Sequence, residues 1–260
     1  SARLLLPLMG RNLWFGDQDA PPGSHGAQRR EALALLSQWN GDMSQHDAEP
    51  LIYAAWARAL QRRILADELG QLAASFRQVD PLFLERVLRD FNGAASWCDL
   101  TATTERETCT QMASLALDDA IYELQDAQGD TINRWRWGEA HQAFFENPVF
   151  GRMPIVGWFA NIWHESSGGD QTLNRGISIG TGAAPYTNVN GAGFRMVVNL
   201  SNPDSSLYIA ATGQSGHILS RFYDDMNQLW RQGEYLQMSL DPTQARGGAA
   251  GISNLTPLAE

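Results

Sequence analysis

Hydrophobic residues in the first half of the chain recur with the spacing of α-helices. Between residues 27 and 128 this pattern predicts four helices. The first covers Arg30–Trp39. The second begins near Pro50, where a proline fits the first turn, and ends at Gly70. The third and fourth helices complete a bundle-like half.

The last two helices of this half carry start and stop signals of their own. Asp80 is the expected N-cap of the third helix, Pro81 its first residue, and Asn92-Gly93 its end. The fourth helix is expected to begin at Thr104, because Glu107 follows three residues later and completes a capping box. Its length makes it the longest helix predicted.

After Trp135 the hydrophobic period moves from that of a helix towards the alternation of strands. Phe194–Leu200 is predicted to be a strand covered on both faces, since Val197 is apolar as well as its neighbours. Asn202–Ser205 is a turn cluster, and Leu207–Ala211 is expected to return as the antiparallel neighbour. A further strand and a late helix are predicted over Ile177–Thr181 and Arg221–Arg231.

These patterns favour an α+β chain in which a mainly helical lobe, residues 1–130, precedes a β-rich part, residues 131–260. The 260 residues are 43% hydrophobic, so the chain can bury a sizeable core. A formal net charge of −10 argues against nucleic acid and against anionic membrane surfaces as partners. No apolar run is long enough to span a membrane, and Leu4–Met9, broken by Pro7, is too short for the core of a signal peptide.

Ser215 is the first candidate nucleophile. It lies in Gly213-Gln214-Ser215-Gly216-His217, but a nucleophile elbow needs glycine at the second position after the serine, where His217 stands. A tight structural connection between strand and helix is the expected role of this segment. All 19 basic residues are arginine, which excludes Schiff-base chemistry on a lysine.

Metal and cofactor sites find little support in the sequence. His164-Glu165 lacks the second histidine of a zinc motif, because Gly168 occupies that position. Gly180-Thr181-Gly182 is too short a signature for a phosphate loop. Four tryptophans of the β-rich part are expected in the core rather than around a ligand: Trp135, Trp137, Trp158 and Trp163.

Cys98 and Cys109 are the only cysteines. Their spacing permits one local disulfide and equally permits two free thiols. Neither has a histidine close in sequence that would indicate thiolate catalysis.

Several segments together resemble the penicillin amidase family of N-terminal-nucleophile hydrolases, which includes penicillin acylases and acyl-homoserine-lactone acylases. Trp135–His141 (WRWGEAH) resembles the family's Trp-Gly-x-x-His segment, and Gly168–Asn174 (GGDQTLN) its Gly-Gly-x-x-Thr-Val-Asn segment. Gly193–Leu200 resembles a core strand of the family. The most specific match is the C-terminal signature, which comprises Thr212–His217, Tyr223–Asp225 and Trp230–Tyr235, and Trp39–Met43 resembles the segment before the helical insertion.

The resemblance places this chain in the C-terminal portion of the β chain, whose strands would complete an αββα sandwich. It implies that the nucleophilic N-terminal serine, the oxyanion-hole groups, the calcium site and the α chain all lie upstream, so no catalytic, cofactor or metal residue is expected here. Ser1 begins the chain, yet its surroundings do not resemble the nucleophile segment, which leads directly into a core strand. The expected partners are the remaining β chain, the α chain and a small-molecule amide.

The same resemblance bears on the cysteines and on location. Trp97-Cys98-Asp99 and Glu107-Thr108-Cys109 resemble a segment of the acyl-homoserine-lactone acylases, and the family is exported to an oxidising compartment. It therefore implies a Cys98–Cys109 disulfide and a periplasmic or extracellular location.

Two functional hypotheses follow. In the first, the chain is the inactive structural part of an amide hydrolase, and separation from the rest leaves apolar surface exposed and favours self-association. In the second, it is an independently folding interaction module without catalysis.

Overall fold

The computed structural model describes residues 1–13, 20–247, 249 and 251–257. These form two compact units, Ser1–Gly191 and Ala192–Glu260. The mixture of helices with mainly antiparallel strands confirms the α+β class. None of the described helices is long and apolar enough to cross a membrane.

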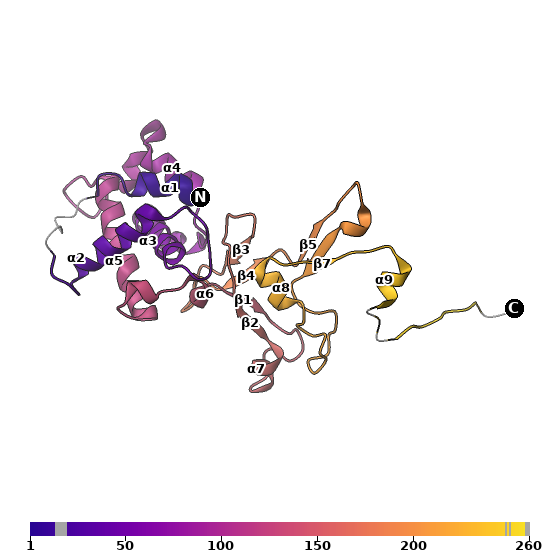
Figure 1. Cartoon of the computed structure of the whole chain (residues 1–260). Helices are drawn as coiled ribbons and strands as arrows, with labels where there is room; N and C mark the ends of the chain where they lie inside the picture. Colours follow the sequence, from indigo (N-terminus) through magenta and orange to yellow (C-terminus); the bar gives the residue numbers. More distant parts are fainter. Residues whose placement is uncertain (14–19, 248, 250, 258–260) are drawn as a thin grey trace. The chain divides into compact units, whose positions relative to one another are not determined.

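Five helices form the helical lobe of the first unit and gather around a shared core (Figure 1). They are α1 Ala2–Met9, α2 His25–Gln38, α3 Glu49–Leu69, α4 Pro81–Leu88 and α5 Cys109–Gln128. The two long helices, α3 and α5, pack closely, and Trp56 of α3 donates its indole N–H to the Ala113 carbonyl of α5 at 2.7 Å. Both partners are buried, so this bond satisfies polar groups that would otherwise destabilise the core.

Local signals set most boundaries of these helices. Pro50 lies in the first turn of α3, and Gly70, with φ of +51°, follows its last residue, as predicted. Asp80 caps α4 by accepting from the backbone N–H groups of Leu82 and Phe83. However, α4 ends at Leu88, before the predicted stop. The predicted Asn92-Gly93 break lies inside the next short 3₁₀ segment, η2 Phe91–Cys98.

The predicted start of the fourth lobe helix, α5, at Thr104 is wrong, and α5 with 20 residues is shorter than α3 with 21 instead of being the longest helix. The N-cap is Thr108, which forms a capping box with Gln111. Glu107 takes another role, because its carboxylate accepts from the Leu100 backbone N–H at 2.9 Å and from the Thr103 hydroxyl at 2.7 Å. These bonds fold residues 99–107 into a loop and shift the helix start by one turn.

A four-stranded sheet completes the first unit, with strand order β2-β1-β4-β3. Its strands are β1 Gln142–Phe145, β2 Ile162–Glu165, β3 Gly176–Ser178 and β4 Asn188–Gly191. The β1–β2 and β3–β4 pairs are antiparallel, whereas β1 and β4 run parallel. Short helices α6 Trp137–Ala140 and α7 Val156–Ala160 precede β1 and β2, and 3₁₀ turns span η1 Gly70–Ser75 and η3 Ile132–Arg134.

The second unit is built on an antiparallel sheet of β5 Phe194–Val197, β6 Leu207–Ala210 and β7 Leu236–Gln237. Phe194 pairs with Ala210 and Val197 with Leu207, so the predicted hairpin is confirmed. Its turn contains η4 Pro203–Ser205, and two helices follow, α8 Asn227–Gln232 and α9 Pro242–Gly247. Helix α8 starts later than predicted because residues 213–223 are joined by loop hydrogen bonds.

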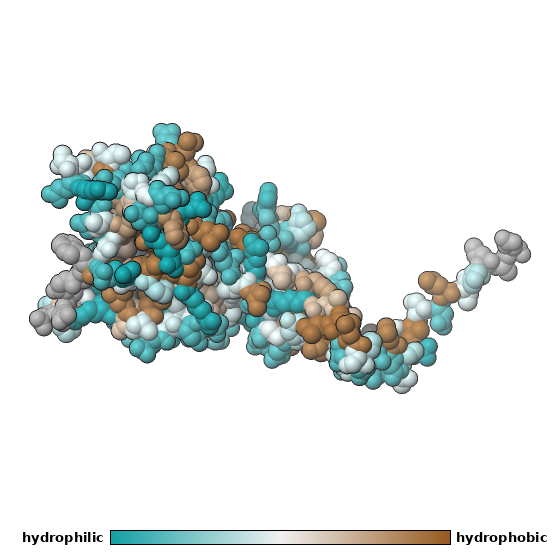
Figure 2. All heavy atoms as spheres, turned by 90° about the horizontal axis from the view of Figure 1, so that it is seen from above, coloured by the Kyte–Doolittle hydropathy of each residue, from teal (hydrophilic) through white to brown (hydrophobic). Residues whose placement is uncertain are grey.

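The prediction that the first of these strands is covered on both faces is wrong for this chain. Phe194, Met196 and Val197 are all exposed, as are Val198 and Leu200 directly after the strand. Figure 2 shows apolar residues, in brown, at the surface of the molecule. The opposite face carries Arg195, whose guanidinium lies over the Trp230 ring, so it is partly covered. The face of Phe194 and Met196 is apolar and exposed, and it lacks the layer that would normally cover it.

Candidate functional site

The segment Trp135–His141 lies where the helical lobe joins the four-stranded sheet of the first unit. Trp137 and His141 stack, with ring centroids 4.3 Å apart, and both are buried. His141 Nδ1 lies 2.7 Å from the Tyr186 carbonyl oxygen. A carbonyl can only accept, so Nδ1 carries the proton of the neutral ring.

The other ring nitrogen faces a crowded, polar interior. His141 Nε2 has no hydrogen-bond partner among the described residues. A Cβ atom on Gly176 would lie 2.6 Å from this nitrogen and 2.6 Å from the Asn188 amide nitrogen, so no larger residue fits there. Burial lowers the pKa of His141 to about 4. The ring is therefore neutral at pH 7. We call the buried contact of Trp137, His141 and the Tyr186 carbonyl, between the helical lobe and the sheet, the joint.

The Gly168–Asn174 segment folds over the same joint. The Trp137 indole N–H donates to the Gly168 carbonyl at 2.8 Å. Within the segment, the Thr172 hydroxyl donates to the Asn174 carbonyl at 2.6 Å and accepts from the Gly169 N–H at 3.0 Å. Two segments that carry the sequence resemblance are thus brought together by their own side chains.

A cavity of about 80 Å³ lies beside this joint, lined by Trp137 together with polar side chains that include Tyr53 and Asp170. Burial raises the pKa of Tyr53 to about 12, which keeps its hydroxyl protonated. Burial also raises the pKa of Asp170, whose carboxylate accepts from the Ser178 backbone N–H at 2.7 Å. Ser1 lines the same cavity, and its carbonyl accepts from the N–H groups of Leu4 and Leu5 at the start of α1.

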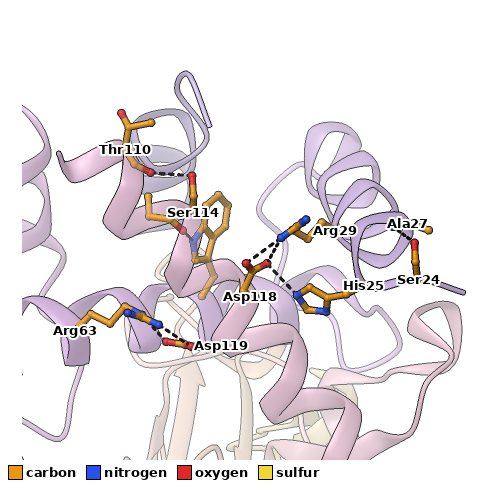
Figure 3. A network of polar contacts seen from close by, with 11 residues as sticks. Ser24, His25, Ala27, Arg29, Arg63, Thr110, Ser114, Asp118 and Asp119 are labelled. Atoms are coloured by element: carbon orange, nitrogen blue, oxygen red, sulfur yellow. Dashed lines mark hydrogen bonds and ion pairs between the residues drawn. The ribbon is translucent and has the colours of Figure 1, made fainter. Parts of the chain in front are cut away.

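Tyr186 connects the joint to the two long helices. Its hydroxyl donates to Glu123 of α5 at 3.1 Å, and Arg58 of α3 donates to the same carboxylate oxygen at 2.8 Å. Further along α5, Asp118 binds Arg29 at 2.8 Å and His25 at 2.9 Å, while Asp119 binds Arg63 (Figure 3). These ion pairs join α2, α3 and α5, so Asp118, Asp119 and Glu123 have a packing role.

Ser215 lies in the second unit, in a loop that separates β6 from α8. Its hydroxyl oxygen accepts from the His217 backbone N–H at 3.1 Å, and the His217 ring accepts from the Leu219 N–H at 3.1 Å. The expectation of a tight strand-to-helix connection is wrong, because residues 211–226 separate the two elements. The imidazole is engaged in the turn and makes no bond to the serine hydroxyl.

The remaining candidates disperse. His164 is part of the β1–β2 ladder, and the described residues contain no group of three or more potential metal ligands. Trp135 and Trp137 are in the core as expected. For Trp158 and Trp163 that expectation is wrong, since both are exposed.

The two cysteines form the expected disulfide. Cys98 and Cys109 are bonded, with Cα atoms 5.0 Å apart. The bridge fixes the end of η2 to the first residue of α5.

Three residues of the joint and the cavity were not predicted from the sequence: His141, Tyr53 and Asp170. The lone signal for the histidine was its place in the Trp-Gly-x-x-His segment.

The α+β fold has a counterpart among solved structures. The thermostable penicillin G acylase from Alcaligenes faecalis matches 99% of this chain, with a TM-score of 0.52 at 16% identity, and the match covers 46% of that structure. The family model for penicillin amidase matches residues 1–247. The chain therefore belongs to the penicillin amidase family.

Curated relatives support the same assignment. The acyl-homoserine lactone acylase QuiP of Pseudomonas syringae pv. syringae (strain B728a) is 25% identical over 228 residues, which are 84% of this chain and 27% of the relative. The penicillin acylase 2 proenzyme of Pseudomonas sp. (strain SE83) is 26% identical over 211 residues, 80% of this chain and 26% of that protein. The chain thus spans about a quarter of the length of these relatives.

Proposed function

We propose that this chain is the C-terminal part of the β chain of an acylase that hydrolyses an amide bond. The family match over residues 1–247 carries the proposal, and similarity to an acyl-homoserine lactone acylase and to a penicillin acylase proenzyme supports it. The helical lobe would flank the substrate cleft, and the strands of the second unit would complete the αββα core.

In the proposed reaction, an N-terminal serine upstream of this chain attacks the amide carbonyl. Its α-amine accepts the hydroxyl proton and passes it to the departing amine as the C–N bond breaks. Water then cleaves the acyl ester and releases a carboxylic acid. This chain contributes scaffold, and the oxyanion-hole groups and a calcium site would lie upstream.

The geometry of the two serines supports a structural role for this chain. Ser215 has no imidazole on its hydroxyl, and the nearest histidine, His217, accepts from the Leu219 backbone instead. Ser1 occupies the N-cap position of α1, and its segment does not lead into a strand. The neutral, buried His141 is a packing element between the lobe and the sheet.

A second reading, an independently folding binding module, draws on one observation. The first unit has its own core and its own cavity beside Tyr53 and Asp170. The exposed apolar strand β5 of the second unit weighs against the whole chain being such a module, because a self-sufficient chain buries such a strand.

The test compares this chain with the parent protein, which is expressed from the same reading frame extended upstream. Both are assayed for release of amine from penicillin G and from N-acyl-homoserine lactones. We expect turnover by the parent alone. Turnover by the isolated chain that disappears in Ser1→Ala or Ser215→Ala would refute the assignment of this chain as scaffold, and a parent inactive on every amide would refute the acylase function.

A further inference from the structure

The loop between β1 and β2 presents an unusual set of side chains to solvent. Residues 153–160 carry no charge, and α7 lies within them at the tip of the β1–β2 hairpin (Figure 1). Ile155 is 79% exposed, Trp158 78% and Phe159 67%. Exposed apolar residues that occur singly are normal, whereas a contiguous group of this size marks an interaction surface.

The loop is held in one shape by bonds from its two asparagines. Asn161 accepts from the Asn147 backbone N–H at 2.8 Å and donates to the Gly151 carbonyl at 2.9 Å. Asn147 in turn accepts from the N–H groups of Val149 and Phe150. These contacts join both ends of the loop and fix its backbone before any partner arrives.

Two glycines allow the chain to cross itself at close range. A Cβ on Gly157 would lie 2.3 Å from the Gly151 carbonyl oxygen, and one on Gly151 would lie 2.5 Å from the Asn147 carbonyl oxygen. The loop is therefore compact, yet its large apolar side chains remain outside.

Ile155 adds backbone strain to this exposure. Its φ of +67° and ψ of −54° are those of a γ-turn, and the matching hydrogen bond runs from the Val156 N–H to the Pro154 carbonyl at 2.7 Å. A β-branched residue rarely adopts positive φ. In this chain, a strained turn thus holds an isoleucine in water, where its side chain contributes no burial.

We propose that residues 147–161 are a preformed docking element for the part of the parent acylase that lies outside this chain, with Ile155, Trp158 and Phe159 as its anchors. The proposal rests on the proposed function. The rest of the parent acylase is the expected partner of the loop, because the chain spans about a quarter of the length of its relatives and most of the parent is therefore available to cover it. A loop whose backbone is already fixed binds with a smaller ordering cost, which makes it an efficient anchor.

Hydroxyl-radical footprinting tests the proposal on the isolated chain and on the parent protein. We expect Met153, Trp158 and Phe159 to be labelled at least fivefold less in the parent, with buried Met112 as the unlabelled reference in both. Labelling within twofold of the isolated chain overturns the proposal. Protection that needs phosphatidylcholine vesicles, or that appears in the isolated chain as its concentration rises, identifies a membrane or a second copy and also overturns it.

Ile155→Gly separates docking from folding, because glycine accepts the positive φ and removes only the exposed side chain. We expect the isolated variant to unfold at an equal or higher urea concentration than the unchanged chain. In the parent, the same substitution should restore labelling of Trp158 at least threefold. Arg89→Gln, at an exposed ion pair with Glu85 on α4 and outside this loop, is the control that should change neither measurement. An Ile155→Gly parent that stays fully protected contradicts the assigned anchor.

Amide hydrolysis by the parent is measured separately from footprinting. A parent that protects the loop but hydrolyses no amide refutes the acylase function and leaves the docking element standing. A parent that hydrolyses amides while the loop is fully labelled refutes the docking element and leaves the acylase function standing.

Discussion

The buried histidine at the joint between lobe and sheet makes the stability of this chain depend on pH. His141 is fully buried, and burial lowers its pKa from 6.5 to about 4. Between these two values the unfolded chain binds a proton that the folded chain excludes. The stability contribution of the neutral ring is therefore fully present above pH 6.5 and is lost progressively as the pH falls to about 4.

The expected size of this loss follows from the shift in pKa. One unit corresponds to about 1.4 kcal/mol, so the shift of His141 predicts a loss of roughly 3 kcal/mol between pH 6.5 and pH 4. This is a large share of the total stability of a domain. Asp170, whose pKa is raised by burial, acts in the opposite direction and favours the folded state as the pH falls.

His141→Phe isolates the contribution of the histidine, because phenylalanine can stack on Trp137 but does not titrate. It leaves the Tyr186 carbonyl without its donor, which should lower stability by about 1–3 kcal/mol at pH 7. Urea unfolding followed by circular dichroism at pH 7, 5.5 and 4 gives the free energy of unfolding of both proteins. We expect the unfolding free energy of the unchanged chain minus that of the variant to fall by roughly 3 kcal/mol between pH 7 and pH 4.

All other ionisable groups are common to the two proteins, so the comparison isolates the substituted residue. Leu117→Ala, a substitution in the buried core that removes no titratable group, is the control, and its loss of unfolding free energy should be the same at all three pH values. An advantage of the unchanged chain over His141→Phe that stays constant to within about 0.5 kcal/mol from pH 7 to pH 4 would refute the reasoning.

Three further predictions concern covalent, packing and association properties. Reduction should raise the intact mass by two hydrogens. Replacing Cys98 and Cys109 by alanine should lower the free energy of unfolding, measured in urea, by at most about 3 kcal/mol. Two thiols that can be titrated in the unfolded chain without reductant would contradict the disulfide. Gly176→Ala should lower the free energy of unfolding by about 2–4 kcal/mol, because its Cβ meets the buried His141 ring. Gly193→Ala is the control and should change the same quantity by less than about 1 kcal/mol, because its Cβ meets nothing within 4 Å. Equal effects of the two substitutions would argue against a steric clash at Gly176. The isolated chain should associate as its concentration rises, and Met196→Lys on the exposed strand should reduce this in light scattering; a strictly monomeric chain would count against an uncovered sheet.

The sequence predicted those features that depend on neighbours along the chain. Pro50 and Gly70 bound α3, and Asp80 caps α4, because a cap or a stop acts through backbone groups within one helical turn. The β5–β6 hairpin followed from alternation and a turn cluster. The disulfide was left open by spacing alone and was resolved in advance only by family resemblance.

Contacts beyond one helical turn overruled the local signals at two places. Thr104 and Thr108 are both acceptable caps, and the choice fell to Thr108 because Glu107 binds the Leu100 backbone instead of closing a capping box. Nothing in the local pattern at Ile155 indicated a positive φ, which the bonds of Asn147 and Asn161 impose on the loop.

The sequence by itself thus determined the class of fold, the family, four helices of the lobe and the β5–β6 hairpin, since hydrophobic period and short motifs are local properties of the chain. Helix α1 and strands β1, β2 and β4 were not predicted. Only the tertiary structure decided that His141, Gly176 and Tyr186 meet in one buried joint, although 45 residues separate the first from the last. It also decided that β5 and the α7 loop remain uncovered in this chain. Burial depends on which distant segments arrive, and a periodic pattern specifies that a face is apolar without specifying what covers it.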